Sequence, residues 1–165
     1  MKVYQLYATQ FLAVTPRTAW DFVSDPENLQ RITPGHMGFR ILAGAGMPMY
    51  PGQIIHYRVS PFRGLTTSWV TEITHVEPER YFVDEQRFGP YSFWHHKHFI
   101  RPVEGGVSME DIIDYKLPFG IIGQWLHGML VKPQLKQIFE YRSMKLQEMY
   151  GHSTGNKASI IFKTV

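Results

Sequence analysis

The sequence predicts an α+β fold in which a curved antiparallel sheet of about six to seven strands wraps around a long C-terminal helix, with two short helices after the first strand. Its 165 residues are enough for one hydrophobic core. Between residues 53 and 117, strand-like segments follow one another at the spacing of an antiparallel meander. From about residue 121 to 150, apolar residues recur every 3.6 positions, which is typical of an amphipathic helix.

Local patterns predict the first strand and the two short helices. Residues 3–12 alternate polar and apolar side chains, which fits a strand better than a signal peptide. Thr15 and Pro16 suit the N-cap and the first position of a helix, because Thr accepts a hydrogen bond from a free backbone N–H and Pro lacks one. Asp25-Pro26 ends this helix and begins a second helical turn, which stops before Pro34.

The remaining strands are separated by turn residues such as Gly89-Pro90 and Glu104-Gly105-Gly106. We expect these strands at residues 39–42, 53–59, 66–76, 81–88, 91–101 and 107–117. The helix that follows is about 40 Å long at roughly 1.5 Å per residue, should kink at Pro133 and ends at Gly151. We therefore predict one domain over residues 1–150 and a loose C-terminal tail over residues 151–165.

The composition excludes several classes of protein. With 44% hydrophobic and 19% charged residues, the chain is neither disordered nor a coiled coil. No run of about 18 apolar residues occurs, so we expect no transmembrane segment. The absence of cysteine excludes disulfides, thiol nucleophiles and thiolate metal sites. We expect a cytoplasmic protein.

The net charge of +3 is unevenly distributed along the chain. Residues 1–120 carry a net charge of −1 and residues 121–165 a net charge of +4. The basic excess is spread along the long helix, at Lys132, Lys136, Arg142 and Lys145. This spacing predicts a solvated helix face and lacks the dense basic stripe of a nucleic-acid-binding protein. We therefore expect no nucleic-acid partner.

The two faces of the predicted sheet differ, since successive side chains of a strand point to opposite faces. One face carries charged residues suited to solvent, namely Arg87, Lys97, Glu110 and Lys116. The other face is mostly large and apolar but also carries Asp84, Gln86, His96, His98, Asp111 and Tyr115. Buried polar groups need partners. These residues therefore either satisfy one another in a network or line a cavity that admits water or a ligand.

Six segments of the chain carry recognisable motifs: Asp25-Pro26-Glu27-Asn28-Leu29, Trp69-x-Thr71-x-Ile73, Phe82-x-Asp84-x-Gln86, Trp94-x-His96-x-His98, Asp111-x-x-x-Tyr115-x-Leu117-Pro118-Phe119-Gly120 and Ile138-Phe139-x-Tyr141-Arg142. Together with the order of elements, they resemble the START-like (SRPBCC) superfamily and its helix-grip fold. The resemblance covers about residues 3–150. Within the superfamily, the motifs most resemble the bacterial, ligand-binding, polyketide-cyclase-like branch. It implies a hydrophobic ligand held between sheet and helix, and it cannot separate carriers from cyclases or hydrolases.

The resemblance and the faces of the strands predict a cavity for a small, largely hydrophobic ligand of lipid, polyketide or isoprenoid type. We expect its apolar walls from Tyr57, Trp69, Phe82, Trp94, Ile100, Met109, Ile113 and Tyr115, closed by Trp125 and Met129 of the helix. We expect its polar contacts, which orient the ligand, from Asp84, Gln86, His96, His98 and Asp111.

His96-x-His98 places two imidazoles on one face of a strand, about 6.5–7 Å apart, a spacing that metal sites also use. Asp111 on the neighbouring strand would complete a two-histidine, one-carboxylate set. The motif is similar to the His-x-His of double-stranded β-helix metal enzymes, but Glu104 falls in a turn and the long helix fits that fold badly. We therefore favour a hydrogen-bonded network and predict no metal and no cofactor.

Two alternatives to simple ligand binding stay open. The first is an acid–base enzyme of the cyclase or hydrolase type that uses the His96/His98–Asp111 cluster, with Asp84 as a second orienting carboxylate. No Ser–His–Asp triad is expected from the outward-facing serines, Ser68, Ser92 and Ser108. The second alternative is a protein-interaction module with a filled core, which would bind a protein partner or a second copy of itself.

The hairpin at residues 104–106 makes the strands of His98 and Asp111 antiparallel neighbours. A turn centred between residues 104 and 105 places His98 opposite Asp111, with their Cβ atoms about 4.5–5.5 Å apart. Asp111 should raise the pKa of His98 while burial lowers it, so we predict a coupled pair. We expect this pair to anchor the ligand.

Overall fold

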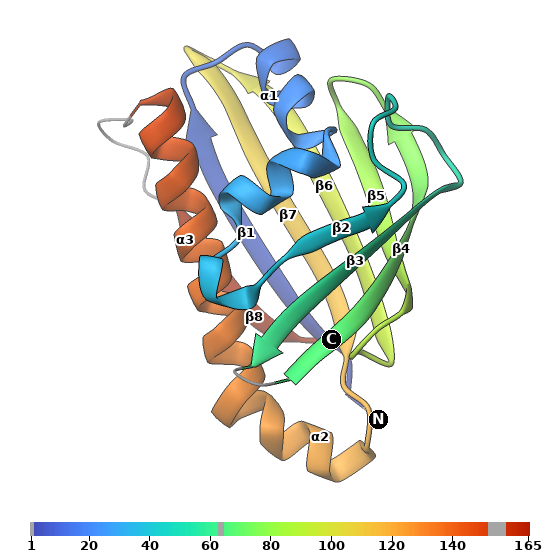
Figure 1. Ribbon diagram of the computed structural model, residues 1–165. Coiled ribbons are helices and arrows are strands. Elements are labelled where there is room, and N and C mark those ends of the chain that lie inside the picture. Colours follow the sequence, from blue (N-terminus) through green and yellow to red (C-terminus); the bar gives the residue numbers. More distant parts are fainter. Residues whose placement is uncertain (1, 63–64, 152–157) are drawn as a thin grey trace.

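The computed structural model describes residues 2–62, 65–151 and 158–165 (Figure 1). Within these residues a single antiparallel sheet has the strand order β2-β3-β4-β5-β6-β7-β1-β8. Its strands are β1 (Tyr4–Leu12), β2 (Arg40–Ala43), β3 (Gln53–Phe62), β4 (Leu65–Glu77), β5 (Tyr81–Phe88), β6 (Phe93–Val103), β7 (Gly106–Lys116) and β8 (Ser159–Thr164). The predicted α+β class is confirmed, with one strand more than expected.

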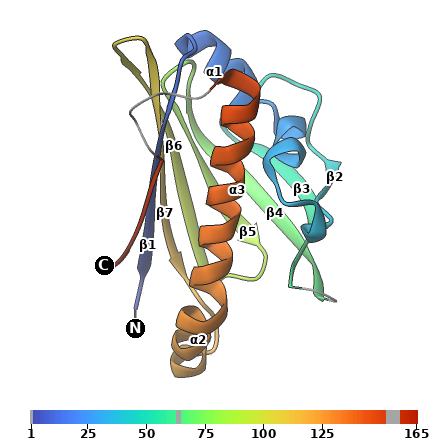
Figure 2. The ribbon, with the colours of Figure 1, turned by 90° about the vertical axis from the view of Figure 1, so that its left-hand side faces the viewer.

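The longest helix runs along one face of the sheet, with shorter helices at the two ends of the molecule (Figures 1 and 2). The helical elements are α1 (Pro16–Val23), the 3₁₀ helices η1 (Pro26–Ile32) and η2 (Gly35–Met37), α2 (Gly120–Leu126), the π-helical turn η3 (His127–Val131) and α3 (Lys132–Tyr150). This arrangement is the predicted helix-grip fold. Among the described residues, none of the helices is both long enough and apolar enough to cross a membrane.

The two short helices begin where the local sequence predicts. The Thr15 side chain accepts a hydrogen bond from the backbone N–H of Thr18, with 3.1 Å between the two atoms, and Pro16 occupies the first helical position. The Asp25 carboxylate caps η1 in the same way, accepting from the N–H of Glu27 at 2.9 Å. Each cap satisfies a donor that the helix itself cannot pair. Together they place α1 and η1 between β1 and β2.

The predicted assignment of the sheet faces is confirmed. The side chain of His96 lies on the inner face and is 5% exposed. Its neighbour Lys97 points to the other face, where its Nζ donates to Asp114 at 2.9 Å. Arg87 likewise donates to Glu72 at 2.6 Å outside the core. Alternation therefore carries charged residues to solvent and histidines inward along the same strands.

The predicted long helix is interrupted before Pro133 as well as affected by it. The π-helical turn η3 joins α2 to α3, and Pro133 follows it directly at the start of α3, where its missing N–H leaves a carbonyl of η3 without the usual helical partner. As a result α2 lies beyond the part of α3 that covers the sheet (Figure 2). Its apolar side chains Ile121, Ile122 and Trp125 are exposed, as are Phe119 just before it and Met129 in η3.

The prediction of a loose tail is wrong for residues 159–164. These residues form β8, which pairs antiparallel with β1 from Thr9↔Ser159 to Tyr4↔Thr164. Ile160 and Phe162 pack against the core beside α3. Burial of their apolar surface therefore stabilises β8 in addition to its hydrogen bonds with β1. Residues 152–157, the first part of the predicted tail, lie outside the described residues.

The register of the β6–β7 hairpin agrees with its prediction. His98 is the direct partner of Asp111, and Val103 is the partner of Gly106. Gly105 in the turn has φ of 77°, a backbone conformation that residues with a Cβ rarely adopt. The turn residue therefore fixes which side chains face one another across the two strands.

Candidate functional site

A cavity of about 210 Å³ lies between the inner face of the sheet and α3. Its walls are mostly apolar and come from β3–β7, the short helices after β1, and α3. The predicted residues that line it are Tyr57, Trp69, Phe82, Asp84, Trp94, His96, His98, Met109 and Asp111. An apolar cavity of about 150 Å³ is enough to hold benzene, so this one accommodates a compact organic molecule.

Several residues predicted to line the cavity lie elsewhere. Ile113 and Tyr115 are fully buried in the core between β1 and α3, and Ile100 packs in a separate core cluster with Trp20. Gln86 binds the β5–β6 turn, where its amide donates to the Tyr91 carbonyl at 2.6 Å. Alternation assigns a side chain to the inner face, but the path of the helices decides whether that side chain meets a helix or the cavity.

Trp125 and Met129 do not close the cavity. They are 77% and 71% exposed, because the interruption at η3 places α2 past the end of the sheet. The helical wall comes instead from the next segment, α3, through Leu135, Ile138, Phe139, Arg142 and Leu146. These residues recur at helical spacing, so the sequence contained the signal for this wall.

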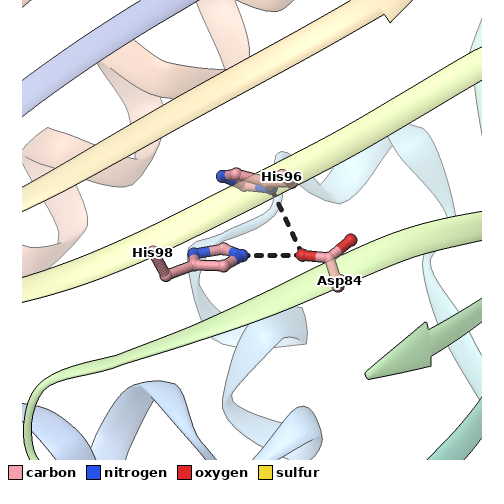
Figure 3. A group of neighbouring side chains, drawn as sticks. All are labelled: Asp84, His96 and His98. Atoms are coloured by element: carbon pink, nitrogen blue, oxygen red, sulfur yellow. Dashed lines mark hydrogen bonds and ion pairs between the residues drawn. The ribbon is translucent and has the colours of Figure 1, made fainter. Parts of the chain in front are cut away.

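Two aspartates and two histidines from three adjacent strands form a cluster on one wall of the cavity. Figure 3 shows three of them, Asp84, His96 and His98. Asp84 on β5 is the direct cross-strand partner of His96 on β6, and Asp111 on β7 is the partner of His98. His98 contacts both carboxylates, with its Nε2 2.7 Å from Asp84 Oδ2 and its Nδ1 2.9 Å from Asp111 Oδ1. The side chain of His98 therefore links all three strands.

His96 bridges the same two carboxylates with weaker geometry. Its Nε2 lies 2.9 Å from Asp111 Oδ1, but its Nδ1 is 3.4 Å from Asp84 Oδ2. The two imidazoles also contact each other, with ring centroids 3.6 Å apart. The Phe82 ring stacks on His98, with ring centroids 4.0 Å apart. This close packing fixes the rotamers of both histidines.

Burial and hydrogen bonding set opposite proton affinities for the two histidines. Burial and the neighbouring charge of His98 lower the pKa of His96 to about 4. Burial also disfavours the charged form of His98, but hydrogen bonds to Asp111 and Asp84 outweigh it and raise its pKa. Burial thus lowers the pKa of His98 while Asp111 raises it, which is the coupling predicted from the sequence.

The two carboxylates stay ionised despite burial. Burial favours the neutral acid, but the electrostatic interaction with the His96 ring and the hydrogen bond from His98 lower the pKa of Asp84. Hydrogen bonds from His96 and His98 likewise hold the pKa of Asp111 well below its usual range. Paired contacts of this kind compensate the desolvation of buried charges.

Arg142 belongs to the same wall, although its spacing with the lysines of the helix suggested a solvated position. Its side chain is 15% exposed, and its guanidinium lies 4.6 Å from the centre of the Phe139 ring and 3.6 Å from Asp111 Oδ1. It follows Ile138 by four residues and precedes Leu146 by four, which places it on the inward stripe of α3. That spacing was the available signal for a cavity position.

The cluster fits a protonated imidazole better than a bound metal. Asp84, His96 and His98 offer three ligand atoms within 4.8 Å of one another. A zinc ion about 2.0–2.1 Å from both His98 Nε2 and Asp84 Oδ2 would need an angle of about 80° at their present separation, well below the tetrahedral value of about 109°. Figure 3 shows His98 Nε2 directed at the Asp84 oxygen, as in a hydrogen bond.

A second polar group lies on the neighbouring strands β3 and β4. The Tyr57 hydroxyl is 2.6 Å from the Thr71 hydroxyl, which also accepts a hydrogen bond from the indole N–H of Trp69 at 3.0 Å. Burial raises the pKa of Tyr57, so its hydroxyl stays protonated. Thr71, which the parity of β4 placed inward, therefore orients two aromatic residues of the cavity.

Comparison with solved structures shows the same fold in several bacterial proteins. Protein Ms6760 from Mycobacterium smegmatis shares 16% identity with a TM-score of 0.63, covering 88% of this chain and 92% of that chain. TTHA0849 from Thermus thermophilus shares 16% identity with a TM-score of 0.67, covering 87% and 94%. CV1439 from Chromobacterium violaceum shares 11% identity with a TM-score of 0.67, covering 90% and 99%. At these identities the likeness concerns the fold alone.

Sequence comparison supplies the family. No curated protein matches the chain. Residues 12–145, however, match the family described as polyketide cyclase / dehydrase and lipid transport, and this match includes nearly all of the residues that line the cavity. The chain therefore belongs to the polyketide cyclase/dehydrase and lipid transport family of the START-like superfamily.

Proposed function

We propose that this protein binds a small, largely hydrophobic molecule, of lipid, polyketide or isoprenoid type, in the cavity between the sheet and α3. The observation that carries the proposal is the uneven lining of the cavity, which is mostly aromatic and aliphatic but has buried charged side chains clustered on one wall. Ligand sites typically combine apolar walls with a few polar groups that fix orientation. Membership of a family described by lipid transport supports the same function.

The size of the cavity limits the ligand. At about 210 Å³ it lies below the range of about 300–1,000 Å³ that is common for drug-sized ligands. We therefore expect a compact molecule or one segment of a longer chain. Its polar group would face the cluster of Asp84, His96, His98 and Asp111, and its apolar body would contact Trp69 and Phe139.

Native mass spectrometry of freshly purified protein tests the proposal by detecting a small molecule that co-purifies with the chain. The variant Ile138→Trp enlarges a side chain that lines the cavity and should abolish this adduct. Ile122→Trp makes the same change on α2 at a position that is 67% exposed, so it should retain the adduct. Equal adducts on both variants would place the bound molecule outside the cavity and contradict the proposal.

A second candidate function is acid–base catalysis on the bound molecule. It is favoured by the opposite pKa shifts of the adjacent His96 and His98, because groups whose pKa values are pushed apart can serve as acid and base. A hydrolysis, which adds water and splits the molecule, or a cyclisation with loss of water would then change the mass of the co-purified molecule during incubation. His98→Gln should stop that change while keeping the molecule bound, whereas a pure carrier shows no change in either protein.

The alternative of an interaction module with a filled core receives less support. It requires side chains that occupy the whole space between sheet and helix, and the lining of the cavity argues against such packing. Exposed apolar residues on α2 remain available for contact with another molecule.

A further inference from the structure

Arg142 is the least satisfied polar group of the cavity wall. Among the buried side-chain nitrogen and oxygen atoms of the described residues, its Nε lacks a hydrogen-bond partner. A guanidinium carries five N–H donors, and leaving buried donors unpaired costs free energy. The position of Arg142 on the wall therefore points to an acceptor that arrives with a ligand.

Among the described residues, the nearest carboxylate does not supply that acceptor. Asp111 Oδ1 is 3.6 Å from the Arg142 guanidinium, beyond the usual range of about 2.7–3.2 Å for a hydrogen bond. The same oxygen already lies 2.9 Å from His96 Nε2 and from His98 Nδ1. The opposite face of the guanidinium lies over the Phe139 ring, which offers no lone pair.

We infer that Arg142 binds the carboxylate of an amphipathic acid whose apolar body fills the cavity; this inference rests on the proposed function. A guanidinium edge presents two parallel N–H donors, which match the two oxygens of a carboxylate better than the single oxygen of an alcohol or ketone. The apolar lining around Arg142, including Leu135 and Phe139, suits the hydrocarbon part of such an acid. The volume of about 210 Å³, against about 150 Å³ for a cavity that holds benzene, suits a compact acid or one segment of a medium-chain or aromatic acid.

The charge of the cluster is compatible with an incoming anion. With His98 protonated and His96 neutral, the charges of Asp84, Asp111, His98 and Arg142 cancel. A bound carboxylate adds one negative charge, and His96, between the same two aspartates and against His98, is placed to take up one proton. The acid therefore enters without leaving an uncompensated charge in the cavity.

Calorimetric titration with octanoate and octan-1-ol tests the inference, because the two probes share a chain and differ in the head group. We expect the wild-type protein to bind octanoate at least tenfold more tightly than octan-1-ol. Arg142→Gln should remove this preference by weakening octanoate binding tenfold or more while leaving octan-1-ol unchanged. Arg142→Lys keeps the charge but loses the paired donors, so it should retain only a small part of the preference.

A matched control lies on the same helix. Lys136→Gln removes an exposed cation that pairs with Glu140, and it should leave both affinities unchanged. The rigid pair 2-naphthoate and 2-naphthalenemethanol repeats the comparison with an aromatic body. Circular dichroism of each variant shows whether it is folded, and the Arg142→Lys variant decides the question if Arg142→Gln does not fold.

The outcomes separate this inference from the proposed function. If both alcohols bind as tightly as the acids, the cavity binds hydrophobic molecules, and the inference that Arg142 binds a carboxylate is wrong. If the acids bind more tightly but Arg142→Gln and Arg142→Lys keep the full preference, another group binds the carboxylate and the inference is again overturned. If none of the four probes binds, both the inference and the proposed function are contradicted.

Discussion

His98 lies directly opposite Asp111 on the β6–β7 hairpin, with its Nδ1 2.9 Å from Asp111 Oδ1 and its other ring nitrogen 2.7 Å from Asp84. One imidazole therefore pairs with buried carboxylates on both neighbouring strands. Because a buried carboxylate without a partner is costly, the three residues stabilise one another as well as shaping the wall of the cavity.

Asp111→Asn should lower the free energy of unfolding by about 1–3 kcal/mol, since it weakens the contacts of Asp111 with two buried histidines. Urea unfolding at neutral pH measures the loss. Asp114→Asn is the matched control on the same strand, because Asp114 pairs with Lys97 on the outer face and such pairs contribute about 0–1 kcal/mol. Weaker ligand binding at unchanged stability would instead assign Asp111 to the ligand alone, as the sequence led us to expect.

The stability of the protein should fall on acidification through His127. This side chain is 8% exposed, stacks on Tyr4 with ring centroids 3.6 Å apart, and shares a hydrogen bond of 2.7 Å between its Nε2 and the Tyr115 hydroxyl. Burial lowers the pKa of His127, and the charge of Lys132 adds to this effect. The neutral ring is therefore favoured in the folded state. Its contribution is present above the unfolded pKa of about 6.5 and is lost as the pH falls through the folded value.

His127→Gln isolates this effect, because an amide oxygen can accept from Tyr115 but does not titrate. Urea unfolding between about pH 7.5 and 5 should show a steeper loss of stability in the wild type than in the variant. His96, whose pKa is also lowered, contributes to the acid loss of both proteins and cancels in the comparison. Parallel pH profiles for the two proteins would contradict a neutral, buried His127.

Acrylamide quenching of tryptophan fluorescence should report mainly on Trp125. Its side chain is 77% exposed, whereas Trp20 and Trp94 are each 9% exposed. Trp125→Phe should therefore remove most of the readily quenched emission, while Trp94→Phe should leave that fraction in place. If a readily quenched fraction of the same size survives Trp125→Phe, Trp125 is not the exposed tryptophan. The exposed position of α2 would then be contradicted, and the sequence-based prediction that Trp125 closes the cavity would stand.

Replacing one large side chain by alanine should lower stability far more on α3 than on α2. Phe139→Ala removes a ring that is 5% exposed and forms part of the cavity wall, so we expect a loss of about 3–5 kcal/mol. Ile122→Ala on α2 changes a side chain that is 67% exposed, and we expect an effect within about 0.5 kcal/mol. Thermal and urea unfolding of the two variants measure the difference, and equal losses would show that α2 is packed against the protein.

Period-two alternation was sufficient for much of the site. It placed Asp84, His96, His98 and Asp111 on the inner face, and the short β6–β7 turn fixed the pairing of His98 with Asp111. Both results depend on interactions between residues near one another in the chain. The same is true of the caps at Thr15 and Asp25, where the side chain binds a backbone N–H within three residues.

The strand β8, the course of the C-terminal helix and the position of Arg142 depended on the tertiary structure. β8 exists because β1 offers a free edge to residues 150 positions away, a pairing that local alternation does not encode. The interruption at η3 decides that Trp125 faces solvent while Phe139 faces the cavity. Sequence by itself determined the fold class and the polar wall, because periodicity sets which face a side chain takes. Packing between distant elements decided which inward side chains meet a cavity, because that depends on the angle at which a helix crosses the sheet.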